Sequence, residues 1–195
     1  MEEVNILYII IVIVLILSCH MYTEGMMTDV TLVRASFDKK KYMVRNKPGK
    51  RKAANILAKI CDSLKEFIEN LNIKHPNNES CKRLKDRFSV DNVSESSSTD
   101  KYTSYSVNKG EQIVFCLRSK DGKEAIHDEN TIMFVALHEM GHLMSKSIGH
   151  NKEFWDNFAF LLKNAIEDGK YTYQNFKEKP VEYCGTKITD SPIDR

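Results

Sequence analysis

The sequence has little that indicates a disulfide-stapled, repetitive or strongly charged protein. Its cysteines form an odd, scattered set of five without a CxxC pair: Cys19, Cys61, Cys81, Cys116 and Cys184. That pattern suits reduced thiols better than a disulfide framework. The chain has no internal repeats, which excludes a repeat architecture. Its formal net charge of +2 predicts no strongly charged partner for the chain as a whole.

Basic residues are nevertheless concentrated in one segment. The range Lys39–Lys52 holds eight lysines and arginines in fourteen residues. Because charge runs usually face water, a solvated linker and helix start is the simplest interpretation. A weak contact with the phosphates of nucleic acid or with an anionic lipid leaflet is the alternative.

One short motif carries a specific chemistry, His138-Glu139-Met140-Gly141-His142. Four residues make slightly more than one helical turn, so His138 and His142 project from the same helix face toward one ion. Catalytic zinc takes three protein ligands and a water, and a nearby carboxylate can accept the proton of that water. The spacing therefore predicts one Zn²⁺ bound by the two histidines, with Glu139 as the general base.

The residues around the motif support this prediction. Thr131–Leu137 runs apolar into His138, and Leu143 and Met144 continue past it, which predicts a helix largely buried in a domain core. Two histidines and a glutamate inside such a helix are costly to desolvate unless something coordinates or hydrogen-bonds them. A metal ion does so.

His150 is the candidate for the third metal ligand. Ser147-Ile148-Gly149 is expected to break the helix, so that the chain folds back toward the first two histidines. A second helix is then expected, with Asn151 as its N-cap and Asp168-Gly169 at its end. In the alternative, His150 is exposed on a loop and a carboxylate is the third ligand: Glu153, Asp156 or Glu182.

The rest of the chain predicts a domain of helices and strands. Apolar residues recur at helical spacing over Lys52–Leu71, which predicts an amphipathic helix covering one face of a sheet. The range 89–100 is rich in serine and acidic residues and predicts a flexible loop. Tyr102–Val107 and Glu111–Arg118 flank a three-residue turn that ends at Gly110, which predicts a β-hairpin.

The N-terminus begins with a long apolar run. Ile6–Leu17 is twelve uninterrupted apolar residues, and the low-charge stretch covers residues 4–21, so we expect a membrane-spanning helix. A cleaved signal peptide would start with basic residues, whereas this chain has Glu2-Glu3 there. A buried core helix is a further alternative. Basic residues follow the run, so the positive-inside rule favours a single-pass protein with its catalytic domain on the cytosolic side.

Three blocks of sequence carry a resemblance to a known family: Gly110–Arg118, Leu137–His142 and His150–Trp155. With an upstream stretch that starts at Tyr42, they resemble the WLM metalloprotease family, relatives of the SprT and Spartan proteases. The tail from residue 183 to residue 192 is similar to versions of the family from large DNA viruses.

The resemblance implies a zincin-like α+β fold and peptide-bond hydrolysis. It implies that His138, His142 and His150 are the zinc ligands and that Glu139 is the catalytic glutamate. It also implies that an edge strand ahead of the metal-binding helix holds extended substrate, and Glu111–Arg118 occupies that position. Because family members cleave proteins crosslinked to DNA, DNA-dependent proteolysis is an alternative function.

We therefore expect three parts in the chain. Residues 1–24 are predicted to be a transmembrane anchor, residues 25–51 a basic linker with the first strand, and residues 52–195 the zinc metallopeptidase domain. The expected fold class is α+β: a small sheet with a hairpin, the HExxH helix and packing helices, behind the N-terminal transmembrane helix. The expected protein is a monomeric zinc metalloendopeptidase acting on a protein or peptide substrate. An inactive zinc-binding membrane scaffold is the remaining alternative.

Other polar residues have simpler interpretations. Tyr171, Tyr173 or Tyr183 could stabilise an oxyanion beside zinc, although a packed or surface tyrosine is the simpler reading. His75 and His127 have no partners at ligand spacing and are expected on the surface.

Overall fold

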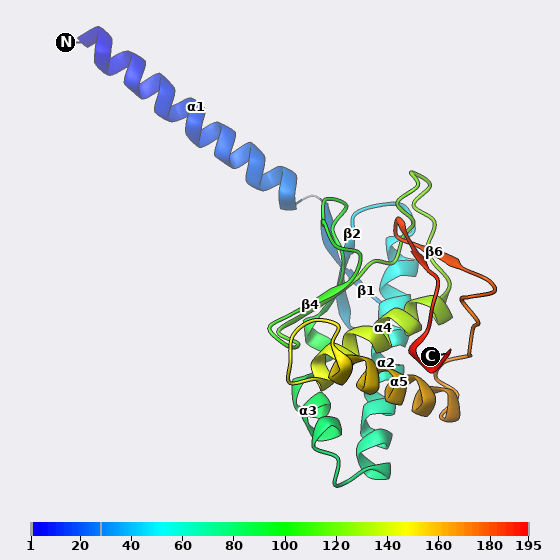
Figure 1. The fold of residues 1–195 in the computed structure, drawn as a ribbon. Helices are drawn as coiled ribbons and strands as arrows, with labels where there is room; N and C mark the ends of the chain where they lie inside the picture. The colour runs from blue at the N-terminus through cyan, green and yellow to red at the C-terminus, as the bar shows by residue number, and fades with distance from the viewer. Residues whose placement is uncertain (1, 28, 195) are drawn as a thin grey trace.

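A five-stranded sheet, with helices packed against it, forms the body of the molecule (Figure 1). The computed structural model describes residues 2–27 and 29–194, and the side chains within them except at residues 2–5, 7 and 22–27. In chain order the elements are α1 (Glu2–Met27), β1 (Val30–Arg34), β2 (Lys41–Arg45), α2 (Lys50–Lys74), α3 (Glu79–Arg87), η1 (Val90–Asn92), β3 (Val93–Glu95), β4 (Tyr105–Val107), β5 (Gln112–Phe115), α4 (Glu129–Met144), α5 (Lys152–Glu167), β6 (Val181–Tyr183), β7 (Thr186–Ile188) and η2 (Pro192–Asp194).

The main sheet is mixed, and its strand order is β1-β2-β3-β5-β4. The pairs β1–β2 and β4–β5 are antiparallel, whereas β3 runs parallel to both β2 and β5. Parallel neighbours need a crossover connection, and α2 lies in the crossover between β2 and β3. A separate two-stranded hairpin, β6–β7, follows α5.

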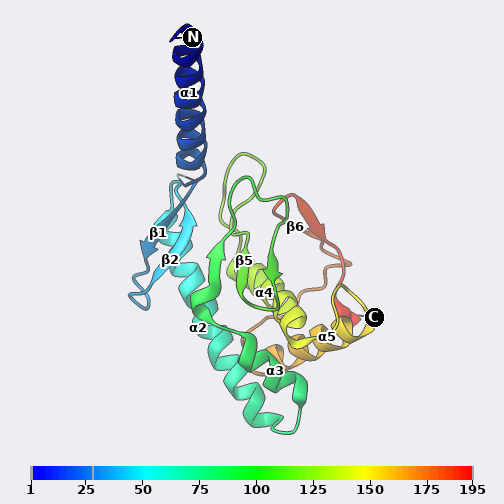
Figure 2. The ribbon, with the colours of Figure 1, turned by 90° about the vertical axis from the view of Figure 1, so that its left-hand side faces the viewer.

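The helix predicted over Lys52–Leu71 is confirmed and is slightly longer, as α2. Its apolar stripe packs against β1, β2 and β3, and Figure 2 shows α2 beside β1 and β2. In β2, the buried Tyr42 and Val44 alternate with the exposed Lys41 and Met43, the pattern of a strand with one covered face. The α+β class predicted from the sequence is therefore correct.

The prediction of a flexible loop over residues 89–100 is wrong for its first half. Val93–Glu95 forms β3, the central strand of the sheet. The acidic composition misled the prediction because Glu95 is buried against Arg118, whose Nε donates to Glu95 Oε1 at 2.8 Å. Local composition cannot reveal a charge partner that lies far along the chain.

That ion pair belongs to a buried polar network. The second oxygen of Glu95 accepts a hydrogen bond from the backbone N–H of Arg45 at 2.8 Å. The guanidinium of Arg45 donates to the carbonyl oxygens of Ser96, at 2.8 Å, and Ser97, at 3.1 Å. Buried charges that are paired in this way avoid the desolvation cost of an isolated charge. The network joins β2 and β3 to the segment that follows β5 and leads to α4.

The predicted β-hairpin is confirmed, with shorter strands. β4 and β5 pair around a turn in which Asn108, Lys109 and Gly110 have positive φ. Because β5 lies between β3 and β4, the segment Glu111–Arg118 is not the edge strand that was expected to hold substrate. The edges of the sheet are β1 and β4, and β4 is the edge strand that contacts the helix α4.

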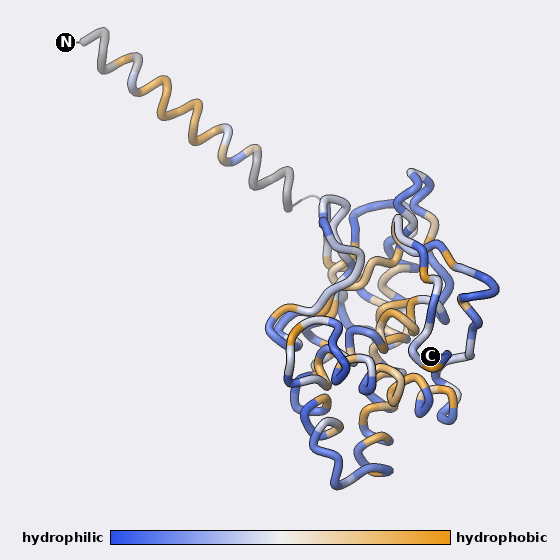
Figure 3. Tube along the Cα trace, viewed as in Figure 1, coloured by the Kyte–Doolittle hydropathy of each residue, from blue (hydrophilic) through white to orange (hydrophobic). Residues whose placement is uncertain are grey.

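The N-terminal helix α1 projects away from the sheet, and its described middle part is apolar (Figure 3). Of the predicted membrane segment 4–21, the side chains at 4, 5 and 7 lie outside the described residues. Across the described residues, no helix combines the length and apolar character that crossing a bilayer requires. The predicted single-pass membrane localisation is therefore wrong. The uninterrupted apolar run of twelve residues rises only about 18 Å, against a hydrocarbon core of about 30 Å.

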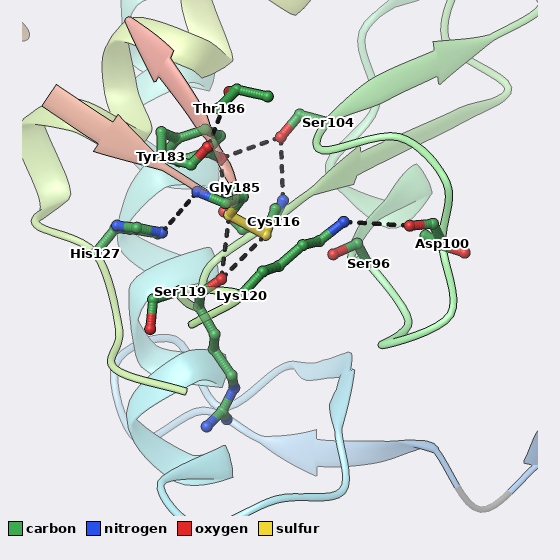
Figure 4. The surroundings of a disulfide bond; sticks show 12 residues. Ser96, Asp100, Ser104, Cys116, Ser119, Lys120, His127, Tyr183, Gly185 and Thr186 are labelled. Atoms are coloured by element: carbon green, nitrogen blue, oxygen red, sulfur yellow. Dashed lines mark hydrogen bonds between the residues drawn. A yellow bond between two sulfur atoms is a disulfide. The ribbon is translucent and has the colours of Figure 1, made fainter. Parts of the chain in front are cut away.

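The prediction of reduced thiols is wrong for two of the cysteines. Cys116, directly after β5, and Cys184, between β6 and β7, form a disulfide with Cα atoms 6.4 Å apart (Figure 4). The two lie 68 residues apart in the sequence, so no local spacing indicated the pair. The disulfide joins the β6–β7 hairpin to the main sheet. Cys61 and Cys81 are buried thiols, and Cys19 is an exposed one.

Candidate metal centre

The helix α4 carries most of the candidate site. It begins at the N-cap Asp128, whose carboxylate accepts the backbone N–H groups of Asn130 at 3.0 Å and Thr131 at 2.9 Å. As the apolar run predicted, most of α4 is buried, packed between α5, α3 and the sheet. His138 and His142 are partly exposed, so the open side of this helix carries the two histidines.

The structure brings His138, His142 and His150 together. Their Nε2 atoms are 3.3 Å apart between His138 and His142, and 3.1 Å apart between His150 and each of the other two. The ring of Phe154 packs against all three imidazoles, with its centroid 4.2 Å from that of His142. The three side chains form a group that could hold a metal ion.

Burial keeps these imidazoles neutral. Desolvation, reinforced by the neighbouring histidines, lowers the pKa of His138 to about 3. Desolvation likewise lowers the pKa of His142 to about 4 and lowers the pKa of His150. The neutral form has a ring nitrogen with a free lone pair, which is the form that metal ions bind.

Glu139 lies beside the histidines on α4 and is only 4% exposed. Burial raises the pKa of its carboxyl to about 7, and a hydrogen bond from the side chain of Ser106 opposes that shift. Ser106 is the middle residue of β4, so the edge strand reaches the carboxylate. A carboxyl group with a pKa near neutrality is suited to accept a proton and return it.

A short loop carries His150 back toward α4, and Glu153 holds that loop. The Glu153 carboxylate accepts the backbone N–H groups of Lys146 at 2.8 Å and Ser147 at 3.0 Å, and the Ser147 hydroxyl at 2.5 Å. These bonds lower the pKa of Glu153 to about 2. The carboxylate therefore acts as an anchor for the loop.

The helix α5 begins as predicted. Asn151 is its N-cap and accepts the backbone N–H of Phe154 at 3.1 Å. Gly149, just before it, has a φ of +84°, which residues with a Cβ rarely adopt. Gly141 lets α5 approach α4, because a Cβ at that position would lie 3.1 Å from the Phe154 ring.

The carboxylates considered as alternative third ligands have other partners. Glu153 is bound to the loop, Asp156 accepts from Lys152 Nζ at 2.6 Å, and Glu182 accepts the backbone N–H of Gly185 at 2.7 Å. The structure thus brings His150, and not these carboxylates, to the histidines of α4.

Three cationic side chains cap the C-terminal end of α4. Lys109, Arg83 and Arg87 come from the β4–β5 turn and from α3. They donate to backbone carbonyls that a helix end leaves without partners, namely those of His142, Leu143, Met144, Ser145 and Ser147. Cations also interact favourably with the negative end of the helix dipole. These contacts fix the end of α4 and the start of the His150 loop.

Two cavities meet at His138 and Glu139. One, of about 340 Å³, lies between β4, the β4–β5 turn and the His150 loop. The other, of about 310 Å³, lies between α4, α5 and the β6–β7 hairpin. Both are lined by Ser104 as well as by the two site residues, so they are neighbours across the site.

The three candidate tyrosines differ in their surroundings. Tyr183 is buried, and its hydroxyl donates to the carbonyl of Cys116 at 2.5 Å. It lines the 310 Å³ cavity beside Glu139. Tyr171 is buried against Phe134, whereas Tyr173 is exposed and donates to a distant carboxylate near the C-terminus. A packed or surface role therefore describes all three.

The two histidines expected on the surface, His75 and His127, are only partly exposed, and both have partners. The Nε2 atom of His127 accepts the backbone N–H of Cys184 at 3.2 Å, and its ring packs on Tyr183. His75 Nε2 lies 3.1 Å from Asn164 Oδ1. Both partners are far along the chain, which is why spacing did not indicate them.

Sequence reasoning also missed residues that support the site. An acidic residue in the first turn of a helix is a recognisable sequence pattern. It indicates that Glu153 stabilises the start of α5, but it does not predict that Glu153 binds the preceding loop. Nothing local marks Ser106, because only the sheet brings it to Glu139. The cations at the end of α4 belong to other elements and carry no sequence signal.

Comparison with known proteins gives the family. The model of the WLM domain matches residues 79–194. Uncharacterized protein R325 of Acanthamoeba polyphaga mimivirus is 31% identical over 191 residues, which cover 96% of this chain and 95% of that protein. Uncharacterized protein 136R of Invertebrate iridescent virus 6 is 36% identical over 69 residues, which cover 35% of this chain and 38% of that protein.

Among solved structures, the chain is similar to Wss1 of Saccharomyces cerevisiae, with a TM-score of 0.48 and 22% identity over 65% of this chain and 88% of that one. A mutant of Wss1 from S. pombe has a TM-score of 0.43 and 23% identity over 63% of this chain and 92% of that one. The match to the family model and the relative that aligns over nearly the full length establish that the chain belongs to the WLM domain family of metalloproteases, among relatives from large DNA viruses.

Proposed function

We propose that the protein is a zinc-dependent metallopeptidase in which His138, His142 and His150 bind one zinc ion and Glu139 is the catalytic base. The observation that carries the proposal is the convergence of three neutral imidazoles beside a buried carboxylate. Membership of a metalloprotease family supports peptide-bond hydrolysis as the reaction.

The distances between the imidazole nitrogens fit zinc. Zinc–imidazole bonds are about 2.0 to 2.1 Å long and tetrahedral, so ligand nitrogens around one ion lie roughly 3.3 Å apart. The Nε2 separations here are 3.1 to 3.3 Å. Three neutral imidazoles whose Nε2 atoms face one another cannot all pair by hydrogen bonds, whereas one cation satisfies all three.

The residues around the histidines supply the other parts of the mechanism. When bound, zinc supplies a Lewis acid that polarises the scissile carbonyl and lowers the pKa of a water. Glu139 accepts the proton of the attacking water and passes it to the leaving amine, and Ser106 orients its carboxylate. β4, at the edge of the sheet, holds the peptide in an extended form through backbone hydrogen bonds.

The test is cleavage of peptide and protein substrates by the zinc-loaded full chain. Glu139→Gln should keep zinc and lose cleavage, whereas His142→Ala should lose both. Glu129→Gln is a matched control, because Glu129 is an exposed glutamate in the first turn of the same helix. Proteolysis retained in the Glu139 variant at the wild-type rate would overturn the proposed mechanism.

A second candidate function is DNA-dependent proteolysis of proteins crosslinked to DNA. A cavity of about 940 Å³ on the outer face of the sheet is lined by four cationic side chains, Arg34, Lys39, Lys40 and Lys41, and by two acidic ones, Asp91 and Glu111. The excess of cations in this groove suits a phosphate backbone. Arg45, which belongs to the same basic run, does not contribute, because it is buried in the network with Glu95.

The DNA question has a direct assay. If DNA binds this groove, single-stranded or duplex oligonucleotides should accelerate cleavage, and the effect should decrease steeply with salt. Replacing Lys39 and Lys41 by glutamate should remove the stimulation and leave peptide cleavage unchanged. Cleavage that is indifferent to DNA would favour the simple peptidase.

A further inference from the structure

The 310 Å³ cavity between α4, α5 and the β6–β7 hairpin has an apolar part next to Glu139, and Lys187 and Asp190 are among the polar residues that also line it. Phe134 and Phe158 are buried in the core, Val135 and Trp155 are partly exposed, and Ile188 comes from β7. We propose that this cavity is a specificity subsite that binds an apolar side chain of the peptide substrate next to the scissile bond. This inference rests on the peptidase function proposed above.

The cavity adjoins the proposed catalytic residues, which indicates that a side chain of the substrate occupies it. His138, Glu139 and Ser104 line this cavity and also the cavity beside β4. An extended peptide along β4 advances about 3.3 Å per residue, and successive side chains point to opposite sides. With its scissile carbonyl at Glu139, such a peptide brings a neighbouring side chain to the mouth of the apolar cavity.

The residues that line the cavity determine which substrate side chains bind there. The ring centroids of Phe134 and Phe158 lie 5.2 Å apart, and the centroid of Phe158 also lies 5.2 Å from that of His138. A leucine or phenylalanine side chain would exchange water for these apolar groups. A small polar side chain such as serine would lose hydration against the aromatic rings and would bury little apolar area in return. The subsite therefore favours large apolar side chains over small polar ones.

The outer wall of the cavity is held in place. The hairpin that carries Ile188 is tied to β5 by the Cys116–Cys184 disulfide (Figure 4). The hydroxyl of Tyr183 donates to the carbonyl of Cys116 at 2.5 Å, and the backbone N–H of Cys184 donates to His127 at 3.2 Å. These contacts hold the hairpin in place on both sides of the disulfide. The cavity is therefore preformed, as ligand pockets usually are.

The binding test uses Trp155, the only tryptophan of the chain, which lines the cavity. The full-length Glu139→Gln variant, loaded with zinc, is titrated with blocked peptides that differ at one position, carrying leucine, phenylalanine, serine or glutamate. We expect the leucine and phenylalanine peptides to change the Trp155 emission and to bind at least about tenfold more tightly than the serine peptide. Equal affinity for all four peptides would overturn the subsite.

A paired substitution tests the position of the subsite. Ile188→Asp should reduce the preference for leucine over serine to less than about threefold, whereas Ile73→Asp, at an exposed site on α2, should leave it unchanged. Thermal unfolding of both variants identifies any loss of folding, and Ile188→Thr, a smaller change, should then reduce the preference in part. A preference that survives every Ile188 substitution in folded protein contradicts the proposal.

A cleavage assay distinguishes a failure of the proposed subsite from a failure of the proposed function. If the wild-type protein cleaves peptides without any preference for apolar residues, the peptidase stands and the subsite is wrong. If no peptide is cleaved but Trp155 still reports tight binding of leucine and phenylalanine peptides, the subsite stands and the proposed function is wrong.

Discussion

Replacing Glu153 with glutamine is expected to weaken metal binding although it changes none of the three histidines. Glu153 holds the loop that carries His150, through hydrogen bonds from Lys146 and Ser147. Glutamine has the same size but has no charge and only one acceptor oxygen. The amide oxygen of the variant can keep the two contacts with Ser147 or the one with Lys146, but not all three, so His150 should sample positions away from the other two imidazoles.

The expected decrease in zinc affinity follows from the hydrogen bonds that the variant loses. Hydrogen bonds to charged groups contribute about 1.5 to 3 kcal/mol each, and partial exposure to water reduces that value. After that reduction, a net loss of about 1 to 2 kcal/mol in holding the loop corresponds to roughly 5- to 30-fold weaker zinc binding. Replacing a residue that orients a metal ligand typically weakens metal binding by about 10- to 100-fold, which overlaps this range.

Competition with a chromogenic chelator measures the zinc affinity of each variant. The matched control is Glu79→Gln, because Glu79 also lies in the first turn of a helix but pairs only with Lys82 at the surface. We expect Glu79→Gln to bind zinc like the wild type. Unchanged zinc affinity in Glu153→Gln would refute the reasoning that this carboxylate organises the His150 loop.

Three further predictions concern stability, all measured by urea unfolding. The pKa of Glu153 is lowered to about 2, so its contribution is complete above the unfolded pKa of about 4.5 and lost as the pH falls toward 2. The metal-free wild type should therefore be more stable than Glu153→Gln by about 1 to 2 kcal/mol at pH 6, with a difference that shrinks below about pH 4.5 and vanishes near pH 2; a constant difference would contradict this. Serine at both Cys116 and Cys184 should cost about 4 kcal/mol, from the loop that the disulfide closes, and no loss would mean that the pair is not joined in solution. Gly110→Ala should cost at least about 2 kcal/mol, because its φ is +115° and a Cβ would lie 2.3 Å from the carbonyl oxygen of Arg87; wild-type stability would show that the turn has another conformation.

Local patterns predicted the elements of this fold better than their arrangement. The α2 stripe, the N-cap at Asn151 and the β4–β5 hairpin follow from side-chain periodicity, capping and turn chemistry, which act within a few residues. The strand β3 was missed because Glu95 looks like a loop residue until Arg118 is beside it. The membrane prediction rested on the low-charge stretch at residues 4–21, and across the described part of the chain no helix is long and apolar enough to cross a bilayer.

In the candidate site, too, some features follow from local sequence and others only from the tertiary structure. The relation of His138, Glu139 and His142 is set by one turn of helix, so the sequence determines it, and the glycine and cap before α5 direct His150 back toward them. The tertiary structure alone decided that β4 is the edge strand, that Ser106 reaches Glu139, and that Cys184 closes the wall beside the site. Each of these depends on residues brought together from distant parts of the chain, where packing and hydrogen bonding choose partners that no local spacing encodes.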